Sequence, residues 1–378
     1  MTTMKSDLFV DGSIVRTTGR AVVYGAGGVG RDVVKVLREA GIVVPCVLDR
    51  AASAGQSCSG VPMFPLDACP LPPRERATVP VVIAIFNRDV DAPAVARALH
   101  DAGFTNVVPF VGLHAEFSGA LGDRFWLTGR GHAASHRDEI ARAQALLADD
   151  RSIVLYRSLI ALREYGTYDA ALNPADGDRQ YLPADVPGWL ARTPMRLVDC
   201  GAYRGDTLEA LLAARVAIEA SAHFEPDIDN FAALASVLRE RLAGTRTEAV
   251  AWPCAVDARA QAVRFDHDGA EAGRVSATGS STVPAVALDD VLIGWRPTLI
   301  KMDIEGSEVE GLLGARGLIA AASPNLALCV YHRPEHLWTI PLLLASWPEM
   351  AGYRYYLRSH GFDGFDTVLY ATPSEVLS

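Results

Sequence analysis

The chain has 378 residues, of which 50% are hydrophobic and 21% charged, so it is long enough for two packed domains and not largely disordered. A formal net charge of -10 without a basic run disfavours binding to nucleic acid through its phosphates. The sequence contains no membrane-length apolar stretch, no signal-peptide pattern and no Cys-x-x-Cys pair among its six cysteines, which together predict a cytoplasmic protein with no membrane partner.

The first part of the chain predicts a small Rossmann-like domain. We expect residues 1–17 to be an N-terminal tail and residues 18–112 to form this domain. Strand-like apolar runs at 21–24, 43–49 and 79–87 alternate with helical patterns, which indicates a parallel sheet. With one more short strand, the block has the size of half a dinucleotide-binding fold.

The sequence GAGGVG follows the first of these strands and opens a helix. Asp49 ends the next strand, 19 positions after Gly30. This is the context of a dinucleotide fingerprint, in which glycines let amides face a phosphate and the acid binds a ribose. A second nucleotide site, for NAD(P) or a nucleotide sugar, would consist of Gly25, Gly27, Gly28, Gly30 and Asp49.

The same block resembles the nucleotide-sugar-binding domain of sugar acyltransferases, through YGAGGVGRDVV, VLD and SGVPMF. The sequence has no second half to hold nicotinamide and no evident acid or base for hydride transfer. A structural domain, or one that makes contacts in a homodimer, is therefore the alternative to a nucleotide-binding domain.

Residues 113–195 are expected to form a helical connector. RDEIARAQALLADD and SIVLYRSLIALREYG carry apolar residues at helical spacing. The polar, proline-rich stretch ALNPADGDRQYLPADVPGW follows them. We expect this stretch to be a loop that reaches the next domain and contributes to its acceptor pocket.

Residues 196–378 show a longer series of alternating strands and helices. The amphipathic helix IDNFAALASVLRERLAG and the helix SEVEGLLGARGLI lie between strands. The expected strands are 195–200, 222–226, 251–256, 297–306 and 325–332, with a closing antiparallel pair at 354–360 and 367–373.

The stretch LVDCGAYRGDT joins the first strand of this block to a helix. Gly201 and Gly205 allow the backbone to approach a ligand closely, and Asp199 lies at the carboxyl end of the strand. Glu225 ends the second strand and could accept hydrogen bonds from two ribose hydroxyls, while Asp257 follows the third and could meet an adenine amino group. This spacing predicts an adenosine-containing cofactor, and by itself it suits an NAD-binding domain as well.

The motifs VDCGAYRGDT, FEPDIDNF, LIKMDIEGSEVEGLLGA and YHRPEHLWTIP, followed by RYYLRSH and TVLYA, resemble the FkbM family of S-adenosylmethionine-dependent methyltransferases over residues 180–375. The most specific part is K-x-D-x-E-G-x-E at 301–308. The resemblance implies an α/β fold with the seven-stranded class I methyltransferase sheet. Arg358-Ser359-His360 and Asp366 depart from the family pattern, so no substrate contact is assigned there.

The resemblance implies that Asp199, Gly201 and Glu225 bind the cofactor. The whole cofactor site expected for S-adenosylmethionine comprises Asp199, Gly201, Ala202, Tyr203, Gly205, Thr207, Glu225, Pro226, Asp257 and Asp303.

The charged strand end predicts a reaction site. Lys301, Asp303 and Glu305 alternate and would share one face of the strand, where burial is costly without pairing or function. His332 ends the following strand and would reach the same edge. Asp303 or His332 could remove a proton from an acceptor hydroxyl. Structural ion pairs and a structural His332 are the alternatives. An acid cluster with a histidine could also hold a divalent metal, but we assign none.

The sequence HRPEH at 332–336 matches the inverted zinc-protease pattern H-x-x-E-H. That motif needs both histidines on one face of a helix. Pro334 lies between them and a strand runs into His332, so we expect no zinc-protease chemistry.

Taken together, the residues predict a methyltransferase that uses S-adenosylmethionine. Asp303, Glu305, His332 and Lys301 are its candidate catalytic residues, and the reaction expected is O-methylation of a small-molecule acceptor, a sugar or a natural product. The alternatives are an NAD(P)-dependent oxidoreductase that uses residues 25–30 and a scaffold that binds nucleotides without catalysis.

Overall fold

The computed structural model describes residues 8–174, 179–266, 273–276 and 279–374. The chain divides into two compact units. Unit 1 contains residues up to 140, 154–175 and 359–365, and unit 2 contains 141–153, 176–358 and the residues from 366 onward. This division differs from the expected one, because the predicted connector is shared between the two units instead of forming a block of its own.

Unit 1 is built on a six-stranded sheet with the order β3-β4-β2-β1-β5-β6. All neighbouring pairs are parallel except β3 and β4. Its core consists of β-branched and aliphatic side chains from the strands, packed with Leu99 and Phe104. The strands are β1 (Val22–Tyr24), β2 (Val47–Leu48), β3 (Ser57–Cys58), β4 (Val61–Phe64), β5 (Pro80–Ile83) and β6 (Asn106–Val108).

The helices of unit 1 follow the expected alternation with strands. α1 (Ile14–Thr18) lies where a tail was expected, and its C-cap is Gly19 at φ 63°. Asp91 caps α4 by accepting a hydrogen bond from the Ala94 amide. The other helices are α2 (Gly28–Glu39), α3 (Pro73–Arg76), α4 (Ala92–Asp101), α5 (Phe110–Leu121) and α6 (His132–Ser135), with short 3-10 turns at Leu66–Ala68, Ala170–Leu172 and Phe362–Gly364.

Two longer helices correspond to the predicted connector helices, α7 (Arg137–Ala145) and α8 (Asp150–Tyr165). Each of them contains residues of both units. Among the described residues, no helix is both long and apolar enough to cross a membrane.

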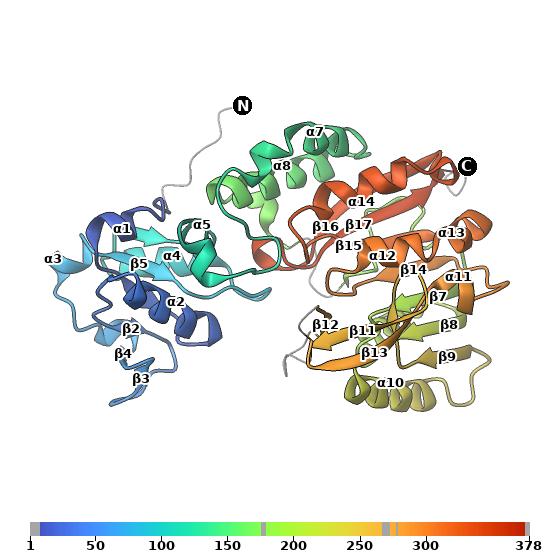
Figure 1. Cartoon of the computed structure of the whole chain (residues 1–378), viewed down its shortest axis with the longest axis horizontal. Helices are drawn as coiled ribbons and strands as arrows, with labels where there is room; N and C mark the ends of the chain where they lie inside the picture. The colour runs from blue at the N-terminus through green and yellow to red at the C-terminus, as the bar shows by residue number, and fades with distance from the viewer. Residues whose placement is uncertain (1–7, 175–178, 267–272, 277–278, 375–378) are drawn as a thin grey trace. The chain divides into compact units, whose positions relative to one another are not determined.

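Unit 2 contains a seven-stranded sheet with the order β16-β17-β15-β14-β7-β8-β9, which can be followed in Figure 1. β9, β8, β7, β14 and β15 are parallel, and β17 runs antiparallel to β15. This is the seven-stranded sheet that the family resemblance implied. The strands are β7 (Met195–Cys200), β8 (Ile218–Phe224), β9 (Glu248–Trp252), β14 (Leu299–Met302), β15 (Asn325–Cys329), β16 (Tyr353–Ser359) and β17 (Thr367–Pro373).

A second sheet of four strands is inserted between β9 and β14, in the order β10-β13-β11-β12. The expected strand 251–256 is divided at Pro253, which has no N–H for a ladder: its first part ends β9, and its last two residues belong to the small sheet. The four strands are β10 (Ala255–Val256), β11 (Gln261–Asp266), β12 (Arg274–Val275) and β13 (Ser281–Val286).

The helix expected at 307–319 is also divided. A Cβ at Gly314 would lie 2.1 Å from the carbonyl oxygen of Asp257, so the chain approaches another backbone closely where α12 ends. The helices of unit 2 are α9 (Asp206–Ala213), α10 (Ile228–Arg241), α11 (Leu288–Val291), α12 (Glu308–Leu313), α13 (Arg316–Ala322) and α14 (His336–Ala345), with a 3-10 turn at Pro348–Met350.

Arg358 on β16 is a buried structural residue. Its guanidinium contacts Asp149 at 2.7 Å, Asp185 at 2.9 Å and the Ser152 hydroxyl at 2.9 Å. Buried charges need such partners. Arg358 therefore ties residues 141–153 and the segment after 178 to the edge of the sheet.

Candidate active site at the end of the seven-stranded sheet

The turn between β7 and α9 lies against the end of β14. Gly201 has φ 74°, and a Cβ there would lie 1.9 Å from the carbonyl oxygen of Asp303. Gly205, at φ 94°, precedes α9. Between them Tyr203 has φ 46° although it is not glycine, a strained conformation of the kind found at functional sites. The glycine turn and the charged strand end are thus adjacent.

Asp199 and Lys301 form a buried ion pair below the turn. Asp199 Oδ1 lies 3.0 Å from Lys301 Nζ, and Asp199 Oδ2 lies 3.4 Å from His223 Nδ1. The Lys301 ammonium also donates a hydrogen bond to the Gly201 carbonyl. Burial acts against both charges, but their attraction holds the pKa of Asp199 below and the pKa of Lys301 above the usual values. Lys301 therefore fixes the turn from beneath.

Lys301, Asp303 and Glu305 were expected to share one face of the strand, and β14 ends at Met302, before the two acids. Lys301 and Asp303 both lie beside Tyr181, whose ring centroid is 5.4 Å from Lys301 Nζ and whose hydroxyl donates to Asp303. Lys301 pairs with Asp199, whereas Asp303 and Glu305 pair with His332.

Glu225 lies beside the glycine turn, directly after β8. Its Oε2 accepts a hydrogen bond from the Tyr203 amide at 2.8 Å, and its Oε1 accepts one from the Asp227 amide at 2.9 Å. Burial raises the pKa of Glu225 to about 7, against the lowering effect of these two amides. Each oxygen retains a lone pair that could accept a further hydrogen bond.

Asp303, Glu305 and His332 form a cluster at the neighbouring strand ends. His332 Nε2 lies 3.3 Å from Asp303 Oδ1 and 3.4 Å from Glu305 Oε2. The Tyr181 hydroxyl donates to Asp303 Oδ2 at 2.7 Å. Both carboxylate side chains are 23% exposed, whereas the His332 side chain is 2% exposed. The cluster therefore presents two carboxylates toward solvent, with a buried imidazole behind them.

Glu308 organises this cluster from within the fold. It is fully buried at the start of α12, and its Oε1 accepts hydrogen bonds from His332 Nδ1 at 2.8 Å and from the Ile304 amide at 3.0 Å. Its Oε2 lies 3.1 Å from His336 Nδ1. Burial would raise the pKa of Glu308, but the two histidines hold it below its usual value. Glu308 thereby orients both the His332 ring and the turn that carries Glu305.

The surrounding carboxylates determine the charge of His332. Burial would lower its pKa, but Glu305 and Glu308 raise it to about 10. In the protein without a ligand, His332 is therefore protonated at neutral pH and is not free to act as a base. The two histidines of HRPEH lie after β15 and at the start of α14, and both face Glu308. This is not the arrangement of a zinc protease.

Of the other predicted cofactor residues, Ala202, Thr207 and Pro226 lie in or beside the same turn, whereas Asp257 follows β10 of the four-stranded sheet and not a strand of the main sheet. The Ala202 amide donates to the Phe224 carbonyl, Thr207 is buried in the first turn of α9, and Pro226 follows Glu225. The carboxylate of Asp257 accepts hydrogen bonds from the Ala258 amide at 2.6 Å and the Gln261 side chain at 2.9 Å. Its contact with adenine stays a prediction.

Three residues of the cluster were absent from the predicted site. Tyr181 lies in the stretch QYLPADVP and is 122 positions from Asp303, so no local pattern pairs them. Glu308 and His336 were visible in the motifs at 301–308 and 332–336. The signal that could have identified them is the i, i+4 spacing of His332 and His336, because two histidines so close in sequence can both contact one acid, Glu308.

In the glycine motif of unit 1, residues 25–30, an amide of the turn donates to an acidic side chain, as the Tyr203 amide does to Glu225 in unit 2. The Ala26 amide donates to Asp49 Oδ2 at 2.7 Å. Gly25 has φ 107°, and a Cβ at Gly30 would lie 2.0 Å from the Gly25 carbonyl oxygen, so packing explains both glycines. Gly27 and Gly28 face open space, where neither φ nor packing requires glycine. Binding of NAD(P) or a nucleotide sugar here stays a prediction.

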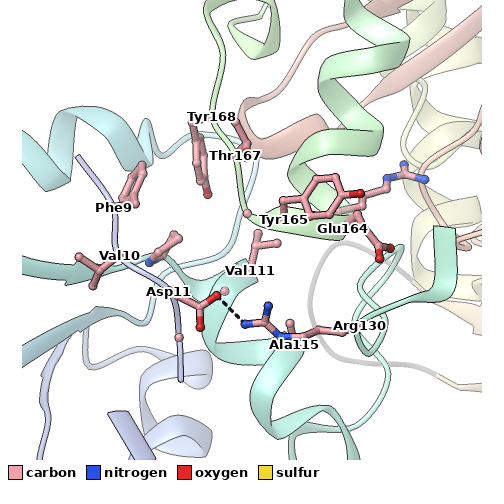
Figure 2. A pocket seen from close by; sticks show the side chains of 15 residues that line it. Phe9, Val10, Asp11, Val111, Ala115, Arg130, Glu164, Tyr165, Thr167 and Tyr168 are labelled. Carbon is pink, nitrogen blue, oxygen red and sulfur yellow. Dashed lines mark hydrogen bonds and ion pairs between the residues drawn. The ribbon is translucent and has the colours of Figure 1, made fainter. Parts of the chain in front are cut away.

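A separate cavity of about 180 Å³ lies elsewhere in unit 1. Figure 2 shows Asp11 and Arg130 in it, paired at 2.7 Å, with Phe9 and Tyr168 on one side. The ring centroids of these two aromatic residues are 4.7 Å apart. None of the predicted site residues lines this cavity.

The chain is similar to a known structure over nearly its whole length, and residues 199–363 match a family model. A methyltransferase FkbM from Methylobacillus flagellatus KT is similar over 97% of this chain and 95% of its own, with a TM-score of 0.76 and 22% identity. At this identity the likeness concerns the fold, and it extends to both units.

Two further methyltransferase structures also match, one from Geobacter sulfurreducens (13% identity, 69% of this chain and 96% of its own) and the SAH-bound PaMTH1 from Podospora anserina (12%, 65% and 97%). Their TM-scores of 0.30 are too low to carry an argument. No curated protein matches the chain. The family model described as the methyltransferase FkbM domain matches residues 199–363, from the end of β7 to the turn before β17, so this part of the chain is similar to the FkbM methyltransferases.

Proposed function

We propose that the protein transfers a methyl group from S-adenosylmethionine to an oxygen of a small-molecule acceptor. The observation that carries the proposal is Glu225, a carboxylate held by two amides beside the glycine turn, with acceptor capacity left for two hydroxyls. A ribose presents two such donors. The Asp303 cluster lies next to the same turn, which suits a cofactor whose reactive carbon must meet a nucleophile.

Transfer from a sulfonium requires alignment and exclusion of water more than covalent assistance. The acceptor oxygen forms a bond to the methyl carbon while the carbon–sulfur bond breaks, and S-adenosylhomocysteine leaves as a neutral thioether. The hydroxyl proton must pass to a base in this step. Of the two predicted bases, Asp303 suits this role better, because His332 is already protonated and Asp303 is partly exposed.

The acceptor class is part of the proposal. We infer a polar hydroxyl compound, such as a sugar or a natural product with neighbouring oxygens, because the partly exposed groups of the cluster are carboxylates. Carboxylates accept hydrogen bonds from several hydroxyls at once.

Titration calorimetry tests the cofactor. The full chain should bind S-adenosylmethionine, and Glu225→Ala should weaken this binding by about 10- to 100-fold, as expected for lost hydrogen bonds to a charged group. Glu248→Ala, which removes an exposed glutamate from β9, is the matched control and should bind normally. Binding of NADH without S-adenosylmethionine would overturn the proposal in favour of an oxidoreductase, and normal binding by Glu225→Ala would refute the ribose contact.

A further inference from the structure

In the cluster of Asp303, Glu305 and His332, two buried polar atoms lack a hydrogen bond, which points to a bound ligand. Within the described residues, His332 Nε2 and Asp303 Oδ1 are buried and make no hydrogen bond. They lie 3.3 Å apart, with Glu305 Oε2 at 3.4 Å from the same nitrogen. The ion-pair contact between these two atoms lacks hydrogen-bond geometry, which is uncommon for buried polar atoms.

We propose that Asp303, Glu305 and His332 bind a divalent cation, and that this cation holds the acceptor oxygen. One ligand atom from each residue lies within 4.8 Å of the others. Neighbouring ligands of an octahedral cation are about 3.0 Å apart for bonds of about 2.1 Å, so a small closing movement, with release of the Nε2 proton of His332 to solvent, brings the three atoms into coordination. Oxygen and imidazole ligands suit Mn²⁺ and related divalent cations.

The residues behind the cluster are arranged as a second shell. His332 Nδ1 donates to Glu308 at 2.8 Å, which turns Nε2 toward the two carboxylates. Metal-bound histidines commonly have such a carboxylate on the other ring nitrogen. Tyr181 holds the second oxygen of Asp303, which leaves Oδ1 facing His332. The side chains of Asp303 and Glu305 are partly exposed, although Asp303 Oδ1 itself is buried.

The cation would define the acceptor more narrowly. It would bind the hydroxyl to be methylated and lower the pKa of that hydroxyl, and an adjacent oxygen of the acceptor could occupy a second coordination position. The hydroxyl proton would pass to a carboxylate oxygen of the cluster that does not bind the cation, so the atoms balance as in the proposed transfer. The role of the cation in methyl transfer rests on the proposed function, whereas cation binding itself does not.

The test uses Mn²⁺ alone with the full chain after removal of metals by a chelator. Loss of the electron paramagnetic resonance signal of free Mn²⁺ should report one bound ion per chain. Asp303→Asn and Glu305→Gln should each weaken binding by about 10-fold or more, by analogy with losses at metal sites. Glu310→Gln removes an exposed carboxylate from α12 and should bind Mn²⁺ as the unaltered protein does.

Thermal melting of each variant shows whether it is folded. His332→Gln, a third variant of the site, should also weaken Mn²⁺ binding. Absence of Mn²⁺ binding by the unaltered chain would overturn the inference and leave a protonated His332 between two carboxylates as the explanation. Equal Mn²⁺ affinity in the cluster variants and the control would overturn it as well. A separate titration with S-adenosylmethionine distinguishes these failures from failure of the proposed function.

Discussion

Replacing Gly201 with alanine should damage both the fold and the cofactor site. The new Cβ would lie 1.9 Å from the Asp303 carbonyl oxygen, whereas ordinary contact begins at 3.4 Å, so the turn and the end of β14 must separate by about 1.5 Å. The left-handed φ adds about 1–2 kcal/mol for a residue with a side chain, and overpacking adds about 1–3 kcal/mol. We expect a loss of about 2–5 kcal/mol in the free energy of unfolding.

The matched control is Gly244→Ala. Gly244 has φ 75°, almost the value of 74° at Gly201, but nothing lies within 4 Å of its added Cβ. It should lose only the backbone contribution of about 1–2 kcal/mol. Urea unfolding followed by tryptophan fluorescence measures both variants, and calorimetry measures S-adenosylmethionine binding. Equal loss of stability in the two variants, with normal cofactor binding by Gly201→Ala, would refute the close-approach argument.

Three further predictions concern charged groups of the site. Burial raises the pKa of Glu225 to about 7, so the carboxylate becomes protonated as pH falls through 7. The affinity for S-adenosylmethionine should therefore fall by about 10-fold from pH 8 to pH 6. A dissociation constant that stays flat from pH 8 to 6 would contradict this. Asp303→Asn should lower turnover by about 100-fold or more in a methyl-transfer assay while cofactor binding stays near normal; surviving turnover would place the base elsewhere. Lys301→Met leaves the fully buried Asp199 without its cation and should lower the free energy of unfolding by about 3–5 kcal/mol, and an unchanged urea midpoint would show that the pair is not needed.

Local sequence patterns predicted the alternation of strands and helices, and the family resemblance implied the seven-stranded sheet. Strand ends of a parallel sheet meet at one edge, so Gly201, Glu225, Asp303 and His332 could be assigned there from chain order. The pattern was insufficient where a strand ends. Glu305 adopts φ 53° beyond β14, and no periodicity predicts where a side chain points after such a residue.

Long-range partners were beyond the sequence for a different reason. The hydroxyl of Tyr181 contacts Asp303 across 122 positions, and buried Glu308 contacts His332, which follows β15, and His336, at the start of α14. A glutamate at the start of a helix is also expected from the helix dipole alone. Only the packed fold distinguishes an exposed acid from one that orients an imidazole.

The buried guanidinium of Arg358 limits where the chain can be shortened and which residues can change independently of one another. Homology marks residues 199–363, yet the carboxylates that neutralise Arg358 are Asp149 and Asp185, which precede that boundary. A chain shortened to begin at residue 196 would lose both carboxylates together with the segments that carry them, and would leave the Arg358 guanidinium without its ionic partners. Asp149, Asp185 and Arg358 should therefore be inherited, and lost, together.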